Sequence, residues 1–217
     1  MGCPTDPFSW RRPGLRNADH FPAEFRPFRL NEPAVSFDRQ PVLEGPLVTL
    51  RPLSPADHDQ LFAVAADPSI WEQHPDKTRS DPDGFNAFFQ QALDSGGALL
   101  AAETTSRRVI GSSRFHGYDE TAGEVEVGWT FLARSHWGGH YNGEMKRLML
   151  EHAFRYVDRV VFLIDPANNR SQRAVQKLGA VRAGMRADAS GRACRVFQIT
   201  AREWRFRSFV RCARGHD

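Results

Sequence analysis

One stretch of the chain has the composition of an anion-binding turn, and it reads Trp137-Gly138-Gly139-His140-Tyr141-Asn142-Gly143. Apolar residues recur at helical spacing directly after it, so the turn leads into the N-terminus of a helix. The first backbone N–H groups of a helix have no partner within the helix, and the helix dipole favours negative charge beside them. We therefore expect this turn to bind a phosphate or a similar anion.

Two carboxylates lie shortly before this turn, at Glu124 and Glu126. Polar and apolar residues alternate from residue 124 to residue 132, which is the period of a β-strand with two unlike faces. Glu124 and Glu126 therefore share one face of this strand, and a carboxylate fixed in this way can serve as a general base. The opposite face is predicted to carry Val125, Val127, Trp129 and Phe131.

The helix that follows the turn is predicted to be amphipathic. Its apolar side carries the residues at helical spacing, which are Met145, Leu148, Met149, Ala153 and Tyr156. Its solvent side is predicted to carry Lys146, Arg147, Glu151 and Arg155.

Two further polar residues, Asn168 and Ser171, follow a short apolar strand at residues 159–164. A second helix is predicted from Gln172 to Leu178, where Gly179 ends it. Ser171 directly precedes this helix, so we predict that its hydroxyl group caps the helix N-terminus.

The rest of the chain supplies the other elements of the fold. Strands are predicted at residues 47–53, 98–104, 109–116, 182–187 and 193–200, in addition to 124–132 and 159–164. Helices are predicted at residues 55–66 and 81–93, the second with Phe85, Phe88, Phe89 and Leu93 along one side. Elements in this order indicate an α+β fold, in which a mixed sheet is flanked by helices.

Three short motifs in this region occur together, and in the same order, in one known family. They are Glu126-Val127-Gly128-Trp129, the turn from Trp137 to Asn142, and Asn168-Asn169-Arg170-Ser171 followed by Lys177-Leu178-Gly179-Ala180. On these motifs the chain resembles the GCN5-related N-acetyltransferase (GNAT) superfamily. Within it, the chain resembles the group of ribosomal-protein N-terminal acetyltransferases (RimJ/RimL type). The resemblance extends over residues 43–204.

The resemblance implies a largely antiparallel sheet of about seven strands that is splayed between the fourth strand and the fifth. It also implies an enzyme that transfers the acetyl group of acetyl-CoA to a primary amine by direct attack, with no metal. Glu126 would be the general base, and Ser171 would donate to the leaving sulfur. Acetyl-CoA would be bound by Phe131, Leu132, Trp137, Gly138, Gly139, His140, Tyr141, Asn142, Asn168 and Ser171.

Several alternatives stay open at this point. The tyrosine that many members use as an acid is replaced by Val175, so Ser171, Tyr141 or solvent would fill that role. His140 stands where the family has a glycine, which predicts either an ordinary helical dihedral or a different path for the phosphate. A non-catalytic acyl-CoA-binding or ribosome-associated module with the same fold is therefore an alternative. The acceptor could be a protein N-terminus, an aminoglycoside, a polyamine, a free amino acid or a toxic amine analogue.

Composition narrows the class of protein further. The chain has 217 residues, of which 41% are apolar, and this suits one domain with its own core. The net charge of +3 is mild, which argues against nucleic acid as a partner, and the basic residues at 205–217 are interpreted as the solvated face of a terminal helix. No membrane span or signal region is recognised, so we expect a cytoplasmic protein. The three cysteines lack the spacing of a zinc site or of disulfide pairs.

Residues 1–42 form a segment of their own ahead of the domain, which we assign to residues 43–204. Half of the 14 prolines lie in this segment and prevent regular helix, yet it also contains aromatic side chains that disordered segments usually lack. We predict an extended arm that packs on the domain or on the second subunit of a homodimer.

Overall fold

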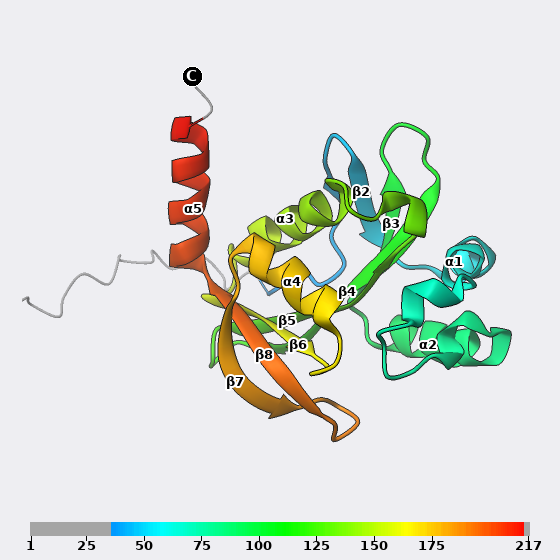
Figure 1. Cartoon of the computed structure of the whole chain (residues 1–217). Coiled ribbons are helices and arrows are strands. Elements are labelled where there is room, and N and C mark those ends of the chain that lie inside the picture. Colours follow the sequence, from blue (N-terminus) through cyan, green and yellow to red (C-terminus); the bar gives the residue numbers. More distant parts are fainter. Residues whose placement is uncertain (1–35, 215–217) are drawn as a thin grey trace, which may run out of the picture. The chain divides into compact units, whose positions relative to one another are not determined.

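The computed structural model describes residues 36–214, with side chains placed as far as Arg207 (Figure 1). The predicted arm therefore lies outside the described residues, apart from residues 36–42. In that short remainder Phe37 is buried, and its ring centroid lies 5.2 Å from that of Phe115 and 5.1 Å from that of Tyr118. The residues just ahead of the first strand thus contribute to the core.

The fold is built on one eight-stranded sheet, which Figure 1 shows with helices on both of its faces. In chain order the strands are β1 (Leu43–Glu44), β2 (Val48–Pro52), β3 (Ala98–Glu103), β4 (Val109–Asp119), β5 (Glu124–Leu132), β6 (Arg159–Ile164), β7 (Val181–Ala187) and β8 (Ala193–Thr200). Their order across the sheet is β1-β2-β3-β4-β5-β6-β8-β7, and every neighbouring pair is antiparallel except β5 and β6. The predicted α+β fold is confirmed. The sheet has one strand more than predicted, because the two-residue β1 pairs with β2 at the edge.

The helices lie where helical spacing predicts them. They are α1 (His58–Ala65), α2 (Pro82–Asp94), α3 (Tyr141–Ala153), α4 (Asn169–Leu178) and α5 (Ala201–Arg214), with one-turn 3₁₀ helices η1 (Pro55–Asp57), η2 (Pro68–Trp71), η3 (Thr78–Ser80) and η4 (Arg134–His136). The expected boundary after residue 204 falls inside α5. None of the helices in residues 36–214 has the length and apolar character needed to cross a bilayer.

Two apolar clusters hold the helices to the sheet. On one face, Phe85, Phe88 and Phe89 of α2 are buried together with Leu100 of β3 and Phe131 of β5. On the other face, α3 buries Met145, Leu148 and Met149 against strand residues that include Ile110 and Val127. Each large apolar side chain buried in this way contributes roughly 1.5–3 kcal/mol. The two clusters fix α2 and the start of α3 on opposite sides of β4 and β5.

Two local predictions about the helices are wrong. Lys146, predicted on the solvent side of α3, is only 4% exposed, because its long side chain extends to the sheet. Ser171 is not the cap of α4. The helix begins earlier than predicted, and the side chain of Asn168 accepts the backbone N–H of Ser171 at 3.0 Å. Asparagine caps a helix as well as serine does, so the first suitable residue in the run takes the position.

Candidate active site

Strands β5 and β6 separate part way along their length. They pair at only three positions, and the last is Glu126 opposite Val161. Beyond this point β5 continues to Leu132 as a neighbour of β4, whereas β6 continues to Ile164 as a neighbour of β8. The facing edges of the two strands are therefore unpaired past Glu126, which leaves a split in the sheet.

A β-bulge lies in β5 beside this split. Gly128 pairs with Arg114 and Phe131 pairs with Ser112, so Trp129 and Thr130 together lie opposite Ser113. Trp129 has a φ of +50°, which costs about 1–3 kcal/mol for a residue with a side chain. The extra residue reverses the faces of the residues that follow, because side chains alternate along a strand. The prediction that Phe131 shares a face with Val127 is therefore wrong: Phe131 packs toward α2 and Val127 toward α3.

The bulge is followed by a backbone amide that faces the split. Ala133 donates its N–H to Ile110 of β4 at 2.7 Å. Backbone groups point alternately to the two sides of a strand, so the N–H and C=O of Leu132 point away from β4. The indole N–H of Trp137 donates to this Leu132 carbonyl at 2.9 Å. Of the two residues that the family resemblance named, Leu132 therefore directs its N–H into the split.

The glycine-bearing turn forms the N-terminus of α3, as its composition predicts. His140 is the residue before the helix, with a φ of −83° and a ψ of −14°, and the backbone N–H of Glu144 donates to its carbonyl at 2.8 Å. Of the two alternatives for His140, the ordinary helical dihedral is the one observed, and its side chain is exposed. Within the described chain, no backbone N–H from Gly138 to Gly143 has a hydrogen-bond partner. This run of amides has the geometry of an anion site.

Trp137 connects this turn to the rest of the site. Besides its bond to Leu132, its ring is covered by the guanidinium of Arg170, which lies 4.2 Å from the ring centroid. Arg170 belongs to α4 and donates to the backbone carbonyls of Ser69 and Ile70. The turn, the edge of the split and the start of α4 are thus held in one arrangement.

The two glutamates of β5 differ in their surroundings. Burial alone would raise the pKa of Glu124, but Arg186 and Arg159, each at 2.7 Å, outweigh it and lower the pKa. Among the described residues no basic side chain forms an ion pair with Glu126. Burial raises the pKa of Glu126 to about 7, although Arg186 nearby acts in the opposite direction. Glu126 is therefore suited to exchanging a proton near neutral pH, whereas Glu124 is held as a charged structural residue.

The residues considered for the acid role differ in their hydrogen bonds. Ser171 stands in the first turn of α4, and its hydroxyl makes no hydrogen bond within the described residues. The hydroxyl of Tyr141 donates to Glu103 at 2.9 Å, and this hydrogen bond raises the pKa of Tyr141. Val175 is buried in the core. Ser171 is the one of these groups with an unengaged hydroxyl.

Lys146 is a site neighbour that sequence reasoning missed. Its Nζ donates to Ser113 Oγ at 3.0 Å and also to the hydroxyl of Thr130, one of the two residues of the bulge. Burial lowers the pKa of Lys146 to about 7. Its position in the helix gave no signal, because it stands beside Arg147 among residues that suit a solvent-exposed face.

The thiol of Cys194 does not add a nucleophile to the site. Burial raises the pKa of Cys194 to about 11, which keeps it protonated and a poor nucleophile. Residues 36–214 contain no group of three or more His, Cys, Asp or Glu side chains placed to hold a metal ion.

Comparison with known proteins agrees with this geometry. The family model described as "Acetyltransferase (GNAT) domain" matches residues 48–181, more than half of the chain. Among solved structures, a probable acetyltransferase of the GNAT family from Chromobacterium violaceum ATCC 12472 superposes with a TM-score of 0.68, at 22% identity over 89% of this chain and 100% of that chain. A GCN5-related N-acetyltransferase from Brucella melitensis gives a TM-score of 0.67, at 19% identity over 76% of this chain and 81% of that chain. At these identities the likeness shows the fold.

Two other similar proteins are informative. RimJ of Mycobacterium smegmatis, solved in complex with CoA-disulfide, gives a TM-score of 0.57 at 18% identity over 75% of this chain and 87% of that chain. The YkkB protein of Bacillus subtilis (strain 168) is 40% identical over 57 residues, which are 25% of this chain and 33% of YkkB. That match thus spans about a third of the length of YkkB. The match to the family model, over a region that contains both the split and the turn, establishes that the chain belongs to the GNAT acetyltransferase family.

Proposed function

We propose that this protein is an acetyl-CoA-dependent N-acetyltransferase that acts on a primary amine in a ternary complex. One observation carries the proposal. The split between β5 and β6 lies beside a helix start at which the amides from Gly138 to Gly143 have no partner within the described chain. An extended thioester with a diphosphate at its far end matches this combination.

Binding of acetyl-CoA would use main-chain groups for the most part. The amides at the start of α3, from Gly138 to Asn142, would donate to the diphosphate. The pantetheine arm would lie in the split, along Phe131 and Leu132 of β5. The Leu132 N–H would stabilise negative charge as it develops on the carbonyl oxygen, since it points into the split. Acetyl-CoA itself supplies the activated acetyl group.

Glu126 would act as the general base, directly or through a water molecule. An amine reaches the enzyme largely as the ammonium ion, so it has to lose a proton before its nitrogen can form the new C–N bond. A carboxyl group with a pKa of about 7 is matched to that transfer at neutral pH. Alignment of two bound reactants supplies much of the remaining rate, with effective molarities of about 10⁵ M or more.

The departing thiolate would need little assistance. An alkyl thiol such as that of CoA has a pKa of roughly 8.5, so its thiolate is a good leaving group when the C–S bond breaks. Ser171 would donate a hydrogen bond to that sulfur, and its unengaged hydroxyl supports this role. Val175 stands where many members of the family have an acidic tyrosine, so that tyrosine is absent from this role here.

The proposal is tested by free-thiol release from acetyl-CoA. The purified full chain is mixed with acetyl-CoA and a panel of amines that covers amino acids, polyamines, aminoglycosides and peptides with free N-termini. We expect thiol release that depends on one class of amine, with one acetylated amine formed per thiol. Glu126→Gln should lower kcat by about 100-fold while acetyl-CoA binding, measured by calorimetry, is retained. Binding of acetyl-CoA without turnover of any amine would favour the non-catalytic module instead.

A further inference from the structure

The side chain of Arg114 is buried without a partner for part of its guanidinium group. Arg114 lies on β4 and is only 4% exposed. Its Nε and Nη2 atoms are buried and have no hydrogen-bond partner within the described residues. Buried donors in folded proteins are almost always satisfied, so two orphaned donors on one cationic group call for an explanation.

Aromatic rings hold this guanidinium in place. It lies 4.8 Å from the ring centroid of Trp129, the bulge residue, and 5.9 Å from that of Phe88 on α2. Such contacts stabilise a cation without satisfying its N–H groups. Burial, together with the positive charge of Arg79, lowers the pKa of Arg114 to about 10, although the charge of Glu126 acts in the opposite direction.

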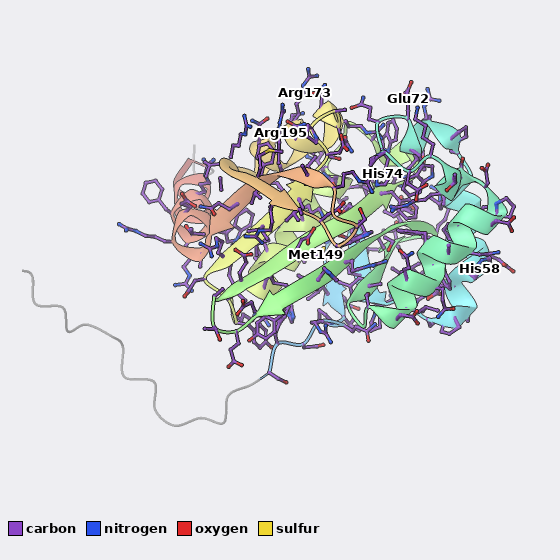
Figure 2. The ribbon with its side chains drawn as sticks, turned by 90° about the horizontal axis from the view of Figure 1, so that it is seen from below. His58, Glu72, His74, Met149, Arg173 and Arg195 are labelled. Carbon is purple, nitrogen blue, oxygen red and sulfur yellow. The ribbon has the colours of Figure 1, made fainter. Side chains whose placement is uncertain are left out.

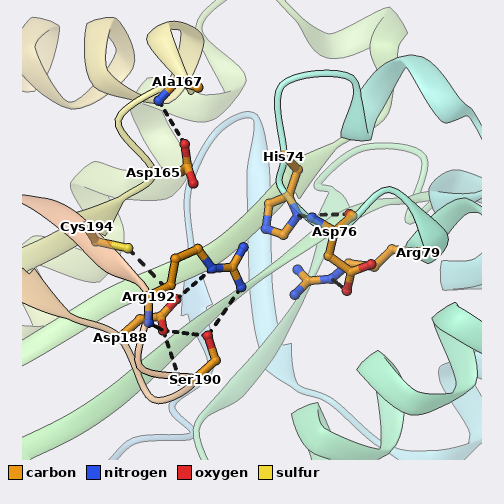
Figure 3. A network of polar contacts seen from close by, with 9 residues as sticks. All are labelled: His74, Asp76, Arg79, Asp165, Ala167, Asp188, Ser190, Arg192 and Cys194. Carbon is orange, nitrogen blue, oxygen red and sulfur yellow. Dashed lines mark hydrogen bonds and ion pairs between the residues drawn. The ribbon is translucent and has the colours of Figure 1, made fainter.

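Arg79, whose charge acts on Arg114, has an anionic partner, and so does Arg192, whose charge acts on Arg79. Arg79 pairs with Asp76 at 3.1 Å, and Arg192 pairs with Asp188 at 3.6 Å. Figure 3 shows that these pairs come from two loops far apart in sequence, with the two guanidinium groups directed toward one another. In the view of Figure 2, His74, from the segment that joins α1 to α2, lies between His58 of α1 and Arg195 of β8. The positive charge of Arg79 thus already acts on Arg114.

The pair of unsatisfied atoms has a specific shape. Nε and Nη2 lie on the same edge of the guanidinium group, and together they form the fork that binds both oxygens of one carboxylate. No carboxylate of the described chain lies within 4.0 Å of Arg114. Within the described residues these two donors have no hydrogen-bond partner, and a carboxylate that comes from outside would complete this fork.

This position is close to the proposed base. Arg114 lies directly opposite Gly128 of β5, and Glu126 is two residues further along the same face. Diagonal neighbours of this kind are roughly 7–8 Å apart, within reach of long side chains. An amine held at Glu126 and a carboxylate held at Arg114 would therefore be the two ends of one short molecule.

We propose that the acceptor is a small amino acid, whose carboxylate is bound by the Nε and Nη2 atoms of Arg114 while its amine faces Glu126. This inference rests on the proposed function and names the substrate class for it. Polyamines and aminoglycosides are excluded, since a polycation would meet unneutralised positive charge at Arg114. Arg114 then determines specificity and takes no part in proton transfer.

The experiment compares amino acids with their carboxamides, which keep the amine and lose the negative charge. Free L-amino acids, β-alanine and 4-aminobutyrate are assayed beside the matching amides by thiol release from acetyl-CoA. We expect at least one acid to exceed its amide about 100-fold in kcat/KM. Arg114→Gln should lower kcat/KM for that acid by about 100-fold, mainly by raising KM. The same substitution should change kcat/KM for the matching amide by less than about threefold. Arg114→Lys, which keeps the charge but loses the fork, should recover part of the loss.

Three outcomes would overturn the inference while the proposed function stands. In the first, carboxamides or polyamines have the same kcat/KM as the acids. In the second, peptides without a free carboxylate are preferred over free amino acids. In the third, Arg114→Gln lowers kcat/KM equally for acids and for amides. The last would mean that Arg114 acts on Glu126 or on the fold. If no amine gives turnover, the proposed function has failed instead. The inference is then decided by calorimetry with amino acids in the presence of CoA: binding lost in Arg114→Gln supports it, and absence of binding to the wild type contradicts it.

Discussion

The Nζ atom of Lys146 lies 3.0 Å from the Oγ atom of Ser113, which stands opposite the bulge in β5. Lys146 also donates to Thr130, on the other strand. Helix α3 is thereby joined to both strands at the point where the split opens. Lys146 has no carboxylate partner among the described residues, and burying such a cation costs free energy in a way that depends on pH.

Lys146→Met should stabilise the fold at neutral pH. The pKa of Lys146 falls from 10.5 to about 7 on folding, so between these values the unfolded chain holds a proton that the folded chain lacks. Stability of the wild type therefore rises with pH across this window, and the advantage of the methionine variant shrinks as pH approaches 10. Ser113 and Thr130 stay satisfied, because their hydroxyl oxygens lie 2.8 Å apart.

Thermal unfolding of both chains between pH 6 and pH 10 measures this effect. We expect a gain of roughly 3 °C or more at pH 6–7 that declines at higher pH. Lys177→Met, at an exposed position on α4, is the control and should show no such trend. A difference in melting temperature that stays constant from pH 6 to pH 10 would mean that the ionisation of Lys146 does not affect the stability of the fold.

Glu126→Gln should remove the pH dependence of the reaction. In the wild type, kcat/KM should rise with a midpoint near pH 7 and level off above it, since the base has to be deprotonated. The variant should have a flat profile at about 1% of the plateau. As pH rises, the contribution of Glu126 to the free energy of unfolding of the wild type falls, whereas the activity rises. The raised pKa of folded Glu126 stabilises the wild type below its unfolded pKa, and this contribution is lost as pH rises through 7.

Glu124→Gln is the matched control on the same face of β5. It breaks ion pairs with Arg159 and Arg186, both of which are partly exposed, so it should destabilise the fold by about 1 kcal/mol. Its kcat/KM should still rise with pH, with a midpoint moved below pH 7, because the charge of Glu124 contributes to the raised pKa of Glu126. If the rise of kcat/KM with pH disappeared in Glu124→Gln and persisted in Glu126→Gln, the roles assigned to the two glutamates would have to be exchanged.

Phe37→Ala should destabilise the fold by about 3 kcal/mol, because it leaves a cavity among aromatic rings. Chemical denaturation followed by fluorescence measures the change. Val42→Ala, at a side chain that is 62% exposed, should change the free energy of unfolding by less than about 0.5 kcal/mol. Equal effects of the two substitutions would contradict the assignment of Phe37 to the core.

The fold and the turn could be predicted from the sequence because their signals are local. Helical spacing gave α3, and the run of glycines ahead of it gave the helix start with its unbonded amides. Ser171 shows the limit of such signals, since Asn168 satisfies the same capping rule three residues earlier.

The parts of the site that could not be predicted depend on contacts across the sheet. Nothing in the local sequence indicates that Trp129 adopts a positive φ, because tryptophan has no preference for that conformation. Alternation therefore assigned Phe131 to the wrong face. Arg114 stands in a strand where one side is as plausible as the other, and its unsatisfied atoms are recognisable only when Trp129 and Phe88 are in position around it.

The claim on which the account depends is that backbone amides at the start of α3 bind acetyl-CoA, and Asn142→Pro tests it most directly. Proline fits the first turn of a helix but has no N–H, so this change deletes one donor and spares the fold. Asn142→Ala keeps the amide and reports on the side chain alone. Calorimetry with acetyl-CoA should give an affinity at least about tenfold weaker for the proline variant than for the alanine variant. Equal affinities in the two, with both chains folded, would contradict the account.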